Sequence, residues 1–431
     1  MSRAAVAAAV AIAFADSSIV VLALPELYGR FHTSITGVSW VITAYNAAVA
    51  AAALGLVLVR RLDARVLLGA GLAVFLGASI ACAVAESLSF LIAARAVQGI
   101  GAALLLTGSL NVLTVRVWTL AGTFGLALGP ALGGVLTQAF DWRAIFVVQA
   151  PVAAVGLLGA VRSRPHAEEV TRSAPAGALR ANACLALLFG ALVGALFLAV
   201  LLVISVWNYS PIGGALIVSS LPAAALAVRP LEARLAGSIA VGGGAALLAV
   251  GLVGFALLPR AGVGLAIWAL ALCGAGLGLA LPVLSNIAVS PTTRSGAFTV
   301  GARHAGLVVA LAVIAPLLAS KVPAAGDRAL LKGTAVLLDA PVGLDKKVPV
   351  ALDLRRAFAR ARDGETPDLA QPFDAHGAKH DSSLAAARDR LVGTIEATIT
   401  RASRSAFFVC AAFAALALLV ALGPRRRTEP R

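Results

Sequence analysis

Charged side chains are scarce in this chain of 431 residues, of which only 13% are Asp, Glu, Lys or Arg. Soluble domains have about 25% charged and about 45–50% apolar residues, whereas 60% of this chain is apolar. This composition excludes an ordinary cytosolic enzyme. Because about 20 apolar residues cross a bilayer, the sequence has material for roughly a dozen membrane-spanning helices.

Sequence patterns of catalysis and cofactor binding are also missing. The chain has no lysine-containing phosphate loop, no Ser-His-Asp set and no CxxC pair, so neither ATP hydrolysis nor covalent catalysis is expected. The four cysteines lie within apolar runs, which favours small buried side chains over a disulfide or metal role: Cys82, Cys184, Cys273 and Cys410. We therefore predict no enzyme activity, no cofactor and no metal. If the protein moves a substrate across a membrane, the energy must come from an ion gradient or from the substrate's own gradient.

Twelve apolar runs are long enough to span a bilayer, and their all-round apolarity favours helices over the alternating strands of a barrel. They lie near 5–24, 39–59, 66–84, 88–112, 118–139, 143–161, 182–205, 211–228, 236–257, 262–285, 296–319 and 405–423. The sequence thus predicts an all-α polytopic membrane protein.

The chain has a net charge of +15, and its arginines are concentrated in the segments expected on one side of the membrane. With a cytoplasmic N-terminus, the inside segments hold sixteen arginines and the short outside loops hold three, which are Arg30, Arg143 and Arg260. This positive-inside bias predicts that both termini are cytoplasmic. Since no basic face is interleaved with exposed aromatics, nucleic acid is not an expected partner.

The basic segment 163–181 divides the spans six and six, as in transporters built from two helical bundles. The expected divisions are an N-terminal bundle 1–162, the linker 163–181, helices seven to eleven in 182–319, a polar segment 320–404, helix twelve in 405–423 and a basic tail 424–431.

The polar segment 320–404 has 14 basic and 11 acidic residues and is expected to form a large extracytoplasmic loop or domain. Within it, 350–362 and 383–402 have helical apolar spacing, and the second could continue into the last span. His376 and His380 are four residues apart, but a solvated loop is favoured over a metal site there.

Four motifs in the first 150 residues resemble the major facilitator superfamily, specifically its multidrug proton-antiporter branch. Residues 16–25 (DSSIVVLALP) are close to the D-x-T-I-V-N-V-A-L-P of that branch, and 91–103 (LIAARAVQGIGAA) look like its motif B. Residues 125–134 (GLALGPALGG) match the antiporter motif C, and 141–151 (DWRAIFVVQAP) resemble the D-W-R-x-x-F…N-x-P that opens span six. The resemblance implies a fold of two six-helix bundles. The better-known members of this branch have fourteen helices, two more than the twelve spans of this chain.

The sequence departs from this pattern between spans two and three. Motif A, G-x-L-x-D-R-x-G-R-R, appears as 55–65 (GLVLVRRLDAR), in which Val59 replaces the acid and Leu62 replaces the second glycine. This leaves open whether the cytoplasmic gating contact of that acid is made. The second half resembles the family more loosely, through 209–214 (YSPIGG) and 303–306 (RHAG).

Asp16 and Arg95 are the main candidates for proton coupling. Asp16 is the acid deep in a span, where an ionised carboxylate normally implies a pathway or a partner, although a packing role is the alternative. Arg95 shares one helical face with Gln98 and Gly99 at i+3 and i+4. The resemblance implies a coupling role for Arg95; the alternative is a tie between carbonyls of adjacent helices.

The small residues of span five, four apart, predict close helix packing, and Pro130 predicts a bend: Gly125, Gly129, Gly133 and Gly134. Arg303 and His304, about mid-span in helix eleven, are also assigned to gating or packing, although the histidine could titrate. Gly99 is also assigned to gating or packing. The candidates for a substrate cavity are Tyr45, Asn46, Gln98, Asn111 and Asn286, although lone amides within spans more often bridge helices.

These patterns together predict a monomeric secondary transporter of the plasma (inner) membrane. It would export hydrophobic or amphipathic small molecules, cationic ones included, in exchange for protons, with membrane lipid as its surroundings. The alternatives are an uptake or facilitated carrier, and a non-transporting membrane protein in which 320–404 mediates an interaction.

Overall fold

The computed structural model describes residues 2–59, 63–163, 177–258, 262–290, 292–360 and 369–423. Every regular element in these ranges is helical, and twelve helices or sets of joined helices are long and apolar enough to cross a membrane. The predicted all-α polytopic class and the number of spans are therefore confirmed. Arg60, Arg61 and Leu62 of motif A, most of the linker (164–176), Arg260 and the basic tail (424–431) lie outside the described residues.

The first six spans are α1 (Ser2–Ile19) with η1 (Val20–Ala23) and α2 (Leu24–Arg30), α3 (Ile35–Leu58), α4 (Ala64–Ala83), α5 (Leu88–Gly108) with η2 (Ser109–Asn111), α6 (Val115–Ala139) and α7 (Arg143–Arg162). The remaining helices are α8 (Ala178–Val200) with η3 (Leu201–Val206), α9 (Pro211–Val218), α10 (Ser220–Ala227), α11 (Arg229–Glu232), α12 (Gly237–Ala256), α13 (Val263–Ala288), α14 (Thr293–Asp339), α15 (Leu344–Arg360), α16 (Gln371–Ala375), α17 (Ser382–Ala402) and α18 (Arg404–Leu422).

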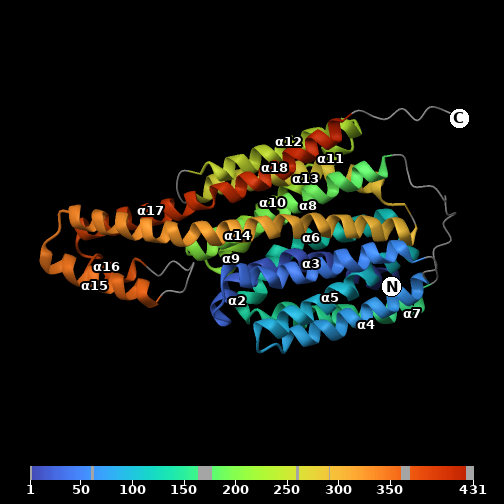
Figure 1. Ribbon diagram of the computed structural model, residues 1–431, viewed down its shortest axis with the longest axis horizontal. Coiled ribbons are helices and arrows are strands. Elements are labelled where there is room, and N and C mark those ends of the chain that lie inside the picture. Colours follow the sequence, from blue (N-terminus) through green and yellow to red (C-terminus); the bar gives the residue numbers. More distant parts are fainter. Residues whose placement is uncertain are drawn as a thin grey trace.

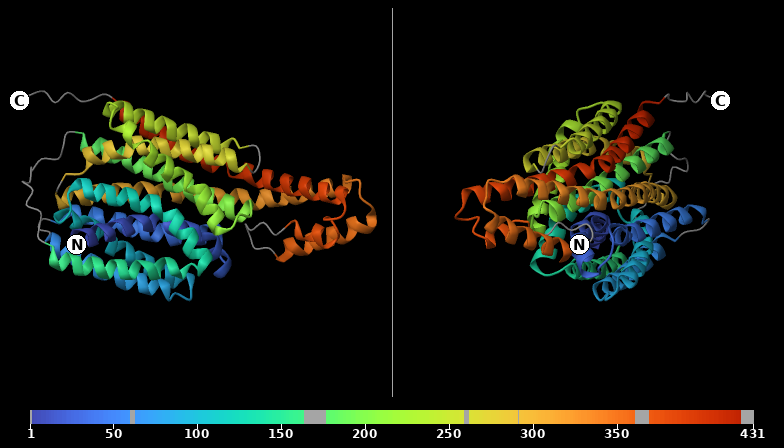
Figure 2. Two further views of the ribbon diagram at one scale, coloured as in Figure 1. Left: turned by 180° about the vertical axis from the view of Figure 1, so that it is seen from behind. Right: turned by 60° about the vertical axis from the view of Figure 1, so that its left-hand side comes forward.

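The spans form two groups that lie side by side along the long axis of the molecule (Figure 1). Helices α1 to α7 make one group, and α8 to α13 with α18 make the other, as the view from behind also shows (Figure 2). Helix α14 contacts α3 of the first group and α8 of the second, and α6 contacts α9 across the same boundary. A two-bundle arrangement therefore positions α3, α6 and α14 at the interface.

Short turns with hydroxyl caps begin several of the spans. The side chains of Ser34, Ser87 and Thr114 each accept a hydrogen bond from the backbone N–H three residues later. Such caps satisfy one of the unpaired donors at a helix N-terminus, which matters because unpaired backbone groups are costly near a membrane. These residues fix where α3, α5 and α6 start and so set the depth of their polar side chains.

The segment after span eleven is a helical extension. Helix α14 has 47 residues and is about 70 Å long, more than twice the roughly 30 Å hydrocarbon core of a bilayer. It runs past the expected end at 319 and lies beside α17, which is followed by α18 (Figure 1). The physical reason is packing against α17, because a Cβ at Gly333 would lie within 4 Å of Leu391 and Ile395 of that helix. Gly333 belongs to a series of buried apolar or small residues at every fourth position: Ala325, Ala329, Gly333 and Leu337.

Helix α17 coincides closely with the predicted stretch 383–402 and leads directly into the last span, while α15 overlaps the predicted stretch 350–362 but begins six residues earlier. Most of the described part of 320–404 is therefore helical and does not form a loop. Which side of the membrane the extension occupies stays a prediction from the arginine distribution.

Ion pairs join the short helices of this extension. Lys346 Nζ on α15 lies 2.6 Å from Asp381 Oδ2 at the start of α17, and the pKa of Asp381 is held well below its usual range by that hydrogen bond and by those from Ser383 and Leu384. His376 Nε2 lies 2.9 Å from Asp353 Oδ2, and this hydrogen bond lowers the pKa of Asp353. In the described ranges no three His, Cys, Asp or Glu side chains are placed to hold a metal ion.

Candidate functional site

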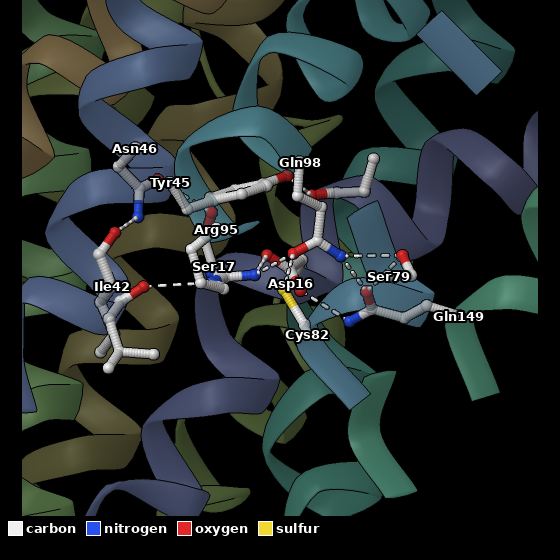
Figure 3. A network of polar contacts seen from close by, with 12 residues as sticks. Asp16, Ser17, Ile42, Tyr45, Asn46, Ser79, Cys82, Arg95, Gln98 and Gln149 are labelled. Carbon is white, nitrogen blue, oxygen red and sulfur yellow. Dashed lines mark hydrogen bonds and ion pairs between the residues drawn. The ribbon is translucent and has the colours of Figure 1, made fainter. Parts of the chain in front are cut away.

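A fully buried ion pair lies within the first bundle. Asp16 on α1 and Arg95 on α5 have no solvent exposure, and Arg95 Nη1 is 2.5 Å from Asp16 Oδ2 (Figure 3). Removing one partner of such a pair leaves an uncompensated buried charge, at a cost of about 3–5 kcal/mol. Any change in the protonation of Asp16 must therefore be accompanied by a rearrangement around Arg95.

Two glutamines close a ring of hydrogen bonds around this pair (Figure 3). Arg95 Nη1 also donates to Gln98 Oε1 at 2.6 Å, Gln98 Nε2 donates to Gln149 Oε1 at 2.6 Å, and Gln149 Nε2 donates to Asp16 Oδ1 at 2.6 Å. Each oxygen of the carboxylate thus accepts from a different donor. Donors thus lead from the guanidinium round to the carboxylate, and neither carboxylate oxygen is left without a hydrogen bond.

Gln149 was missed by the sequence reasoning, and so were Ser79 and the polar contact of Cys82. Gln149 occupies the asparagine position of the family pattern N-x-P, two residues before Pro151, and that position could have identified it. Ser79 Oγ accepts from Gln98 Nε2 at 2.9 Å. Cys82 Sγ lies 3.7 Å from Gln98 Oε1.

Arg95 is fixed on its other side by α3. Its Nε donates to the carbonyl of Val41 at 3.0 Å, and its guanidinium lies over the ring of Tyr45 at 4.3 Å from the ring centre. Tyr45 in turn donates its hydroxyl to the Ala13 carbonyl at 2.8 Å. A Cβ at Gly99 would be 2.3 Å from the Tyr45 carbonyl, so only a glycine lets α5 approach α3 this closely.

A second chain of hydrogen bonds crosses the boundary between the bundles. Ser17, next to Asp16, donates to Asn46 Oδ1 at 3.1 Å, and His304 Nδ1 on α14 is 2.6 Å from the same oxygen. Since Asn46 Nδ2 donates to the Ile42 carbonyl, Oδ1 is the acceptor and His304 Nδ1 carries the proton. The chain Ser17–Asn46–His304 therefore links the surroundings of Asp16 to α14, which packs against α8 of the second bundle.

Arg303, beside His304, is a buried cation with few partners. It is 5% exposed, and its Nη2 donates to Ser285 Oγ on α13 at 2.7 Å. Its guanidinium lies 5.5 Å from the ring centre of Trp118 and 5.1 Å from that of Phe189. Each such ring contact contributes roughly 0.5–2 kcal/mol, less than the several kcal/mol that burying an unpaired ion costs.

Arg303 and Ser285 also line a cavity between α6, α8, α10 and α13. Its empty volume, open mouth included, is about 750 Å³. Thr119 and Thr123 add hydroxyls, and the rest of the wall is mainly apolar and includes Pro130 of the glycine-rich span. A mostly apolar wall with a few polar groups is typical of small-molecule sites.

The glycines of α6 lie against two helices. A Cβ at Gly125 would be 2.0 Å from the Ala11 carbonyl, and Gly129 and Gly133 approach α1 comparably, while Gly134 meets Ala215 of α9 in the other bundle. Asn111 and Asn286 belong neither to the ring around Asp16 nor, in the described part of the chain, to the wall of this cavity.

Known proteins share sequence features and the fold of this chain. The sequence model of the Major Facilitator Superfamily matches residues 6–316. The chain belongs to this superfamily. Members similar in sequence include a methylenomycin A resistance protein of Bacillus subtilis, 34% identical over 160 residues, and the multidrug resistance protein Stp of Mycobacterium tuberculosis, 33% identical over 159 residues.

Those alignments cover 34% and 33% of this chain and 34% and 29% of the two relatives, so the chain spans about a third of the length of the curated relatives it matches. Among solved structures of the superfamily's fold, a bacterial homologue of the human lysosomal transporter Spinster has a TM-score of 0.59 at 16% identity and covers 99% of this chain and 98% of its own. A D-xylose-proton symporter has a TM-score of 0.57 at 13% identity, over 70% of this chain and 87% of its own. Similarity at this level concerns the fold alone.

Proposed function

We propose that the protein is a secondary active transporter of the plasma membrane that exports hydrophobic or amphipathic small molecules in exchange for protons. In this proposal it acts as a monomer with both termini in the cytoplasm, and the proton gradient replaces any cofactor. The observation that carries the proposal is the buried Asp16–Arg95 pair within its ring of amides.

The ring gives Asp16 a way to exchange a proton. When Asp16 is ionised, its two oxygens accept from Arg95 and Gln149. When it is protonated, the attraction to Arg95 is lost, while Arg95 keeps Gln98 and the Val41 carbonyl as acceptors. Protonation thus frees α1 from α5 without leaving the guanidinium entirely without partners.

The movement would reach the second bundle through Ser17, which follows Asp16. A shift of α1 displaces Ser17 relative to Asn46, whose oxygen also holds His304 on α14. Arg303, the residue before His304, lies in the wall of the cavity. We therefore expect one arrangement of the bundle interface to favour proton release at Asp16 and the other to favour substrate release from the cavity.

The test is transport into inside-out vesicles from cells that produce the protein. A panel of lipophilic dyes with cationic, neutral and anionic heads is added, and a proton gradient, acid inside, is imposed. We expect at least one dye class to accumulate only with the gradient, and nigericin to abolish accumulation. Accumulation that ignores the gradient would indicate a facilitated carrier, and accumulation only with the reversed gradient would indicate uptake.

A further inference from the structure

Arg303 has no acidic partner among the residues that the structure describes. The buried acidic and basic side chains there are Asp16, Arg95, Arg303 and His304, and the carboxylate of Asp16 is paired with Arg95. His304 Nδ1 donates to Asn46 Oδ1. Even without any charge on His304, the buried side chains of the described interior carry two arginine cations and one carboxylate, and the unmatched positive charge lies on Arg303.

Arg303 and Ser285 lie together in the wall of the cavity. Arg303 Nη2 donates to Ser285 Oγ, and Arg303 Nε is buried and has no hydrogen-bond partner in the described ranges. The rest of the wall includes apolar side chains such as Leu126, Leu192 and Leu277. The cavity thus combines one cationic, hydrogen-bonding corner with an apolar remainder.

We propose that this cavity binds an amphipathic anion, with its carboxylate or phosphate head on Arg303 and Ser285 and its apolar body between α6, α8, α10 and α13. A guanidinium offers several N–H donors in a plane that fits these heads, and an anion supplies the charge that the described protein groups do not. The inference rests on the proposed function, because it names the substrate class of that transporter. It replaces the cationic substrates expected from the sequence with anionic ones.

The test measures binding rather than transport, so it does not depend on proton coupling. The protein is placed in nanodiscs of phosphatidylcholine, and the fluorescence of a dansyl-labelled undecanoic acid is titrated at neutral pH. The methyl ester of this acid and a dansyl-undecyl trimethylammonium serve as neutral and cationic probes with the same apolar body. We expect the acid to bind more tightly than both.

The variant Arg303→Gln should weaken binding of the acid roughly ten- to hundred-fold, which corresponds to the loss of one charge-assisted hydrogen bond, and should leave the ester almost unchanged. Arg303→Lys retains the charge and should keep the preference for the acid even if the Gln variant folds poorly. Arg294→Gln is the matched control, since Arg294 is exposed on the same helix. It should bind the acid like the parent.

A second arm distinguishes the source of the anion. If an anionic phospholipid is the natural occupant, adding phosphatidylglycerol to the nanodiscs should displace the acid from the parent, and native mass spectrometry should find that lipid retained by the parent and lost from Arg303→Gln. If a free lipophilic acid is the occupant, phosphatidylglycerol should have no effect. Both results support an amphipathic anion.

Equal binding of the three probes, a preference for the ammonium, or unchanged binding of the acid in Arg303→Gln would overturn this inference. Those results would leave the proposed function intact if the vesicles still show proton-driven transport of another dye. Conversely, selective binding of the acid without any proton-driven transport would uphold the anion site and overturn the proton-coupled exporter.

Discussion

The substitution Asp16→Asn tests both the stability and the coupling role of the buried pair. In the parent, both carboxylate oxygens accept, one from Arg95 and one from Gln149. An asparagine has one oxygen and one NH₂ group, so whichever way the amide is turned, a donor faces another donor. The guanidinium is also left buried without its counter-charge.

The expected loss of stability is about 3–5 kcal/mol, which is roughly two to nearly four powers of ten in the ratio of folded to unfolded protein. The double variant Asp16→Asn with Arg95→Gln should recover part of this loss, because no charge is then buried. Thermal unfolding can be followed with a thiol-reactive dye, since all four cysteines are free and buried in the folded state.

Transport provides the second measurement. Asp16→Asn should insert into the membrane but show no stimulation by a proton gradient, whereas Glu86→Gln, at an exposed acid between α4 and α5, should behave like the parent. Two results would refute the reasoning. Gradient-driven transport by Asp16→Asn would remove Asp16 as the proton carrier, and a double variant less stable than Asp16→Asn would show that the uncompensated Arg95 charge is not the source of the loss.

Three further outcomes are expected. Gly125→Ala should lower the thermal stability clearly, because its Cβ would be 2.0 Å from a carbonyl of α1, whereas Gly243→Ala, which has no atom within 4 Å of such a Cβ, should be neutral by the same dye assay. The lowered pKa of Asp381 means that its contribution to the stability of the extension is present above the unfolded carboxyl pKa of about 4 and is lost as the pH falls towards the folded value. The hydrogen-exchange protection factors of α15 and α17 should therefore fall in acid, and Asp381→Asn should reduce that pH dependence to the part that Asp353 contributes. Replacing 325–398 with a flexible linker should preserve insertion and part of the export, since the ring and the cavity lie elsewhere, and correctly inserted protein without any transport would instead give the extension a role in handling the substrate.

The sequence predicted what depends on local composition. Twelve spans followed from apolar runs alone, and Asp16 and Arg95 were identified because a charge within such a run is unusual. The continuation of α14 was not predicted, because the span criterion ends at Lys321 while the helix continues on a different, four-residue pattern from Ala325. That pattern stabilises a helix only when a partner such as α17 covers it.

Features that depend on which helices pack together could not be predicted from the sequence. Gln149 is an ordinary amide until α7 is placed against α1, where it reaches the second oxygen of Asp16. Arg303 was assigned to gating or packing because the sequence does not reveal that its side chain lines a cavity or that Asp16, the buried acid of the described residues, is already paired with Arg95. The ring and the cavity both arise from tertiary packing of spans far apart in the chain.

The two candidate sites are joined through neighbouring residues, and this arrangement yields a final prediction. Asp16 precedes Ser17, Arg303 precedes His304, and Asn46 Oδ1 accepts from both Ser17 and His304. Asn46→Leu removes both hydrogen bonds, each of which contributes about 1 kcal/mol, so it can weaken coupling between the sites by up to about 2 kcal/mol, or roughly thirtyfold.

We therefore expect Asn46→Leu to bind the dansyl-labelled acid but to lose most of the pH dependence of that binding, together with most of the gradient-driven transport. Asn182→Leu is the matched control, because Asn182 is also a buried amide that donates to the carbonyl four residues earlier, yet its oxygen has no partner among the described residues. Linkage requires that a proton and a ligand influence each other's binding by the same factor, so the loss can be measured from either side. If Asn46→Leu keeps the parent's pH dependence while Asp16→Asn loses it, the bundles communicate by another route, and the Ser17–Asn46–His304 chain serves only to pack α3 against α14.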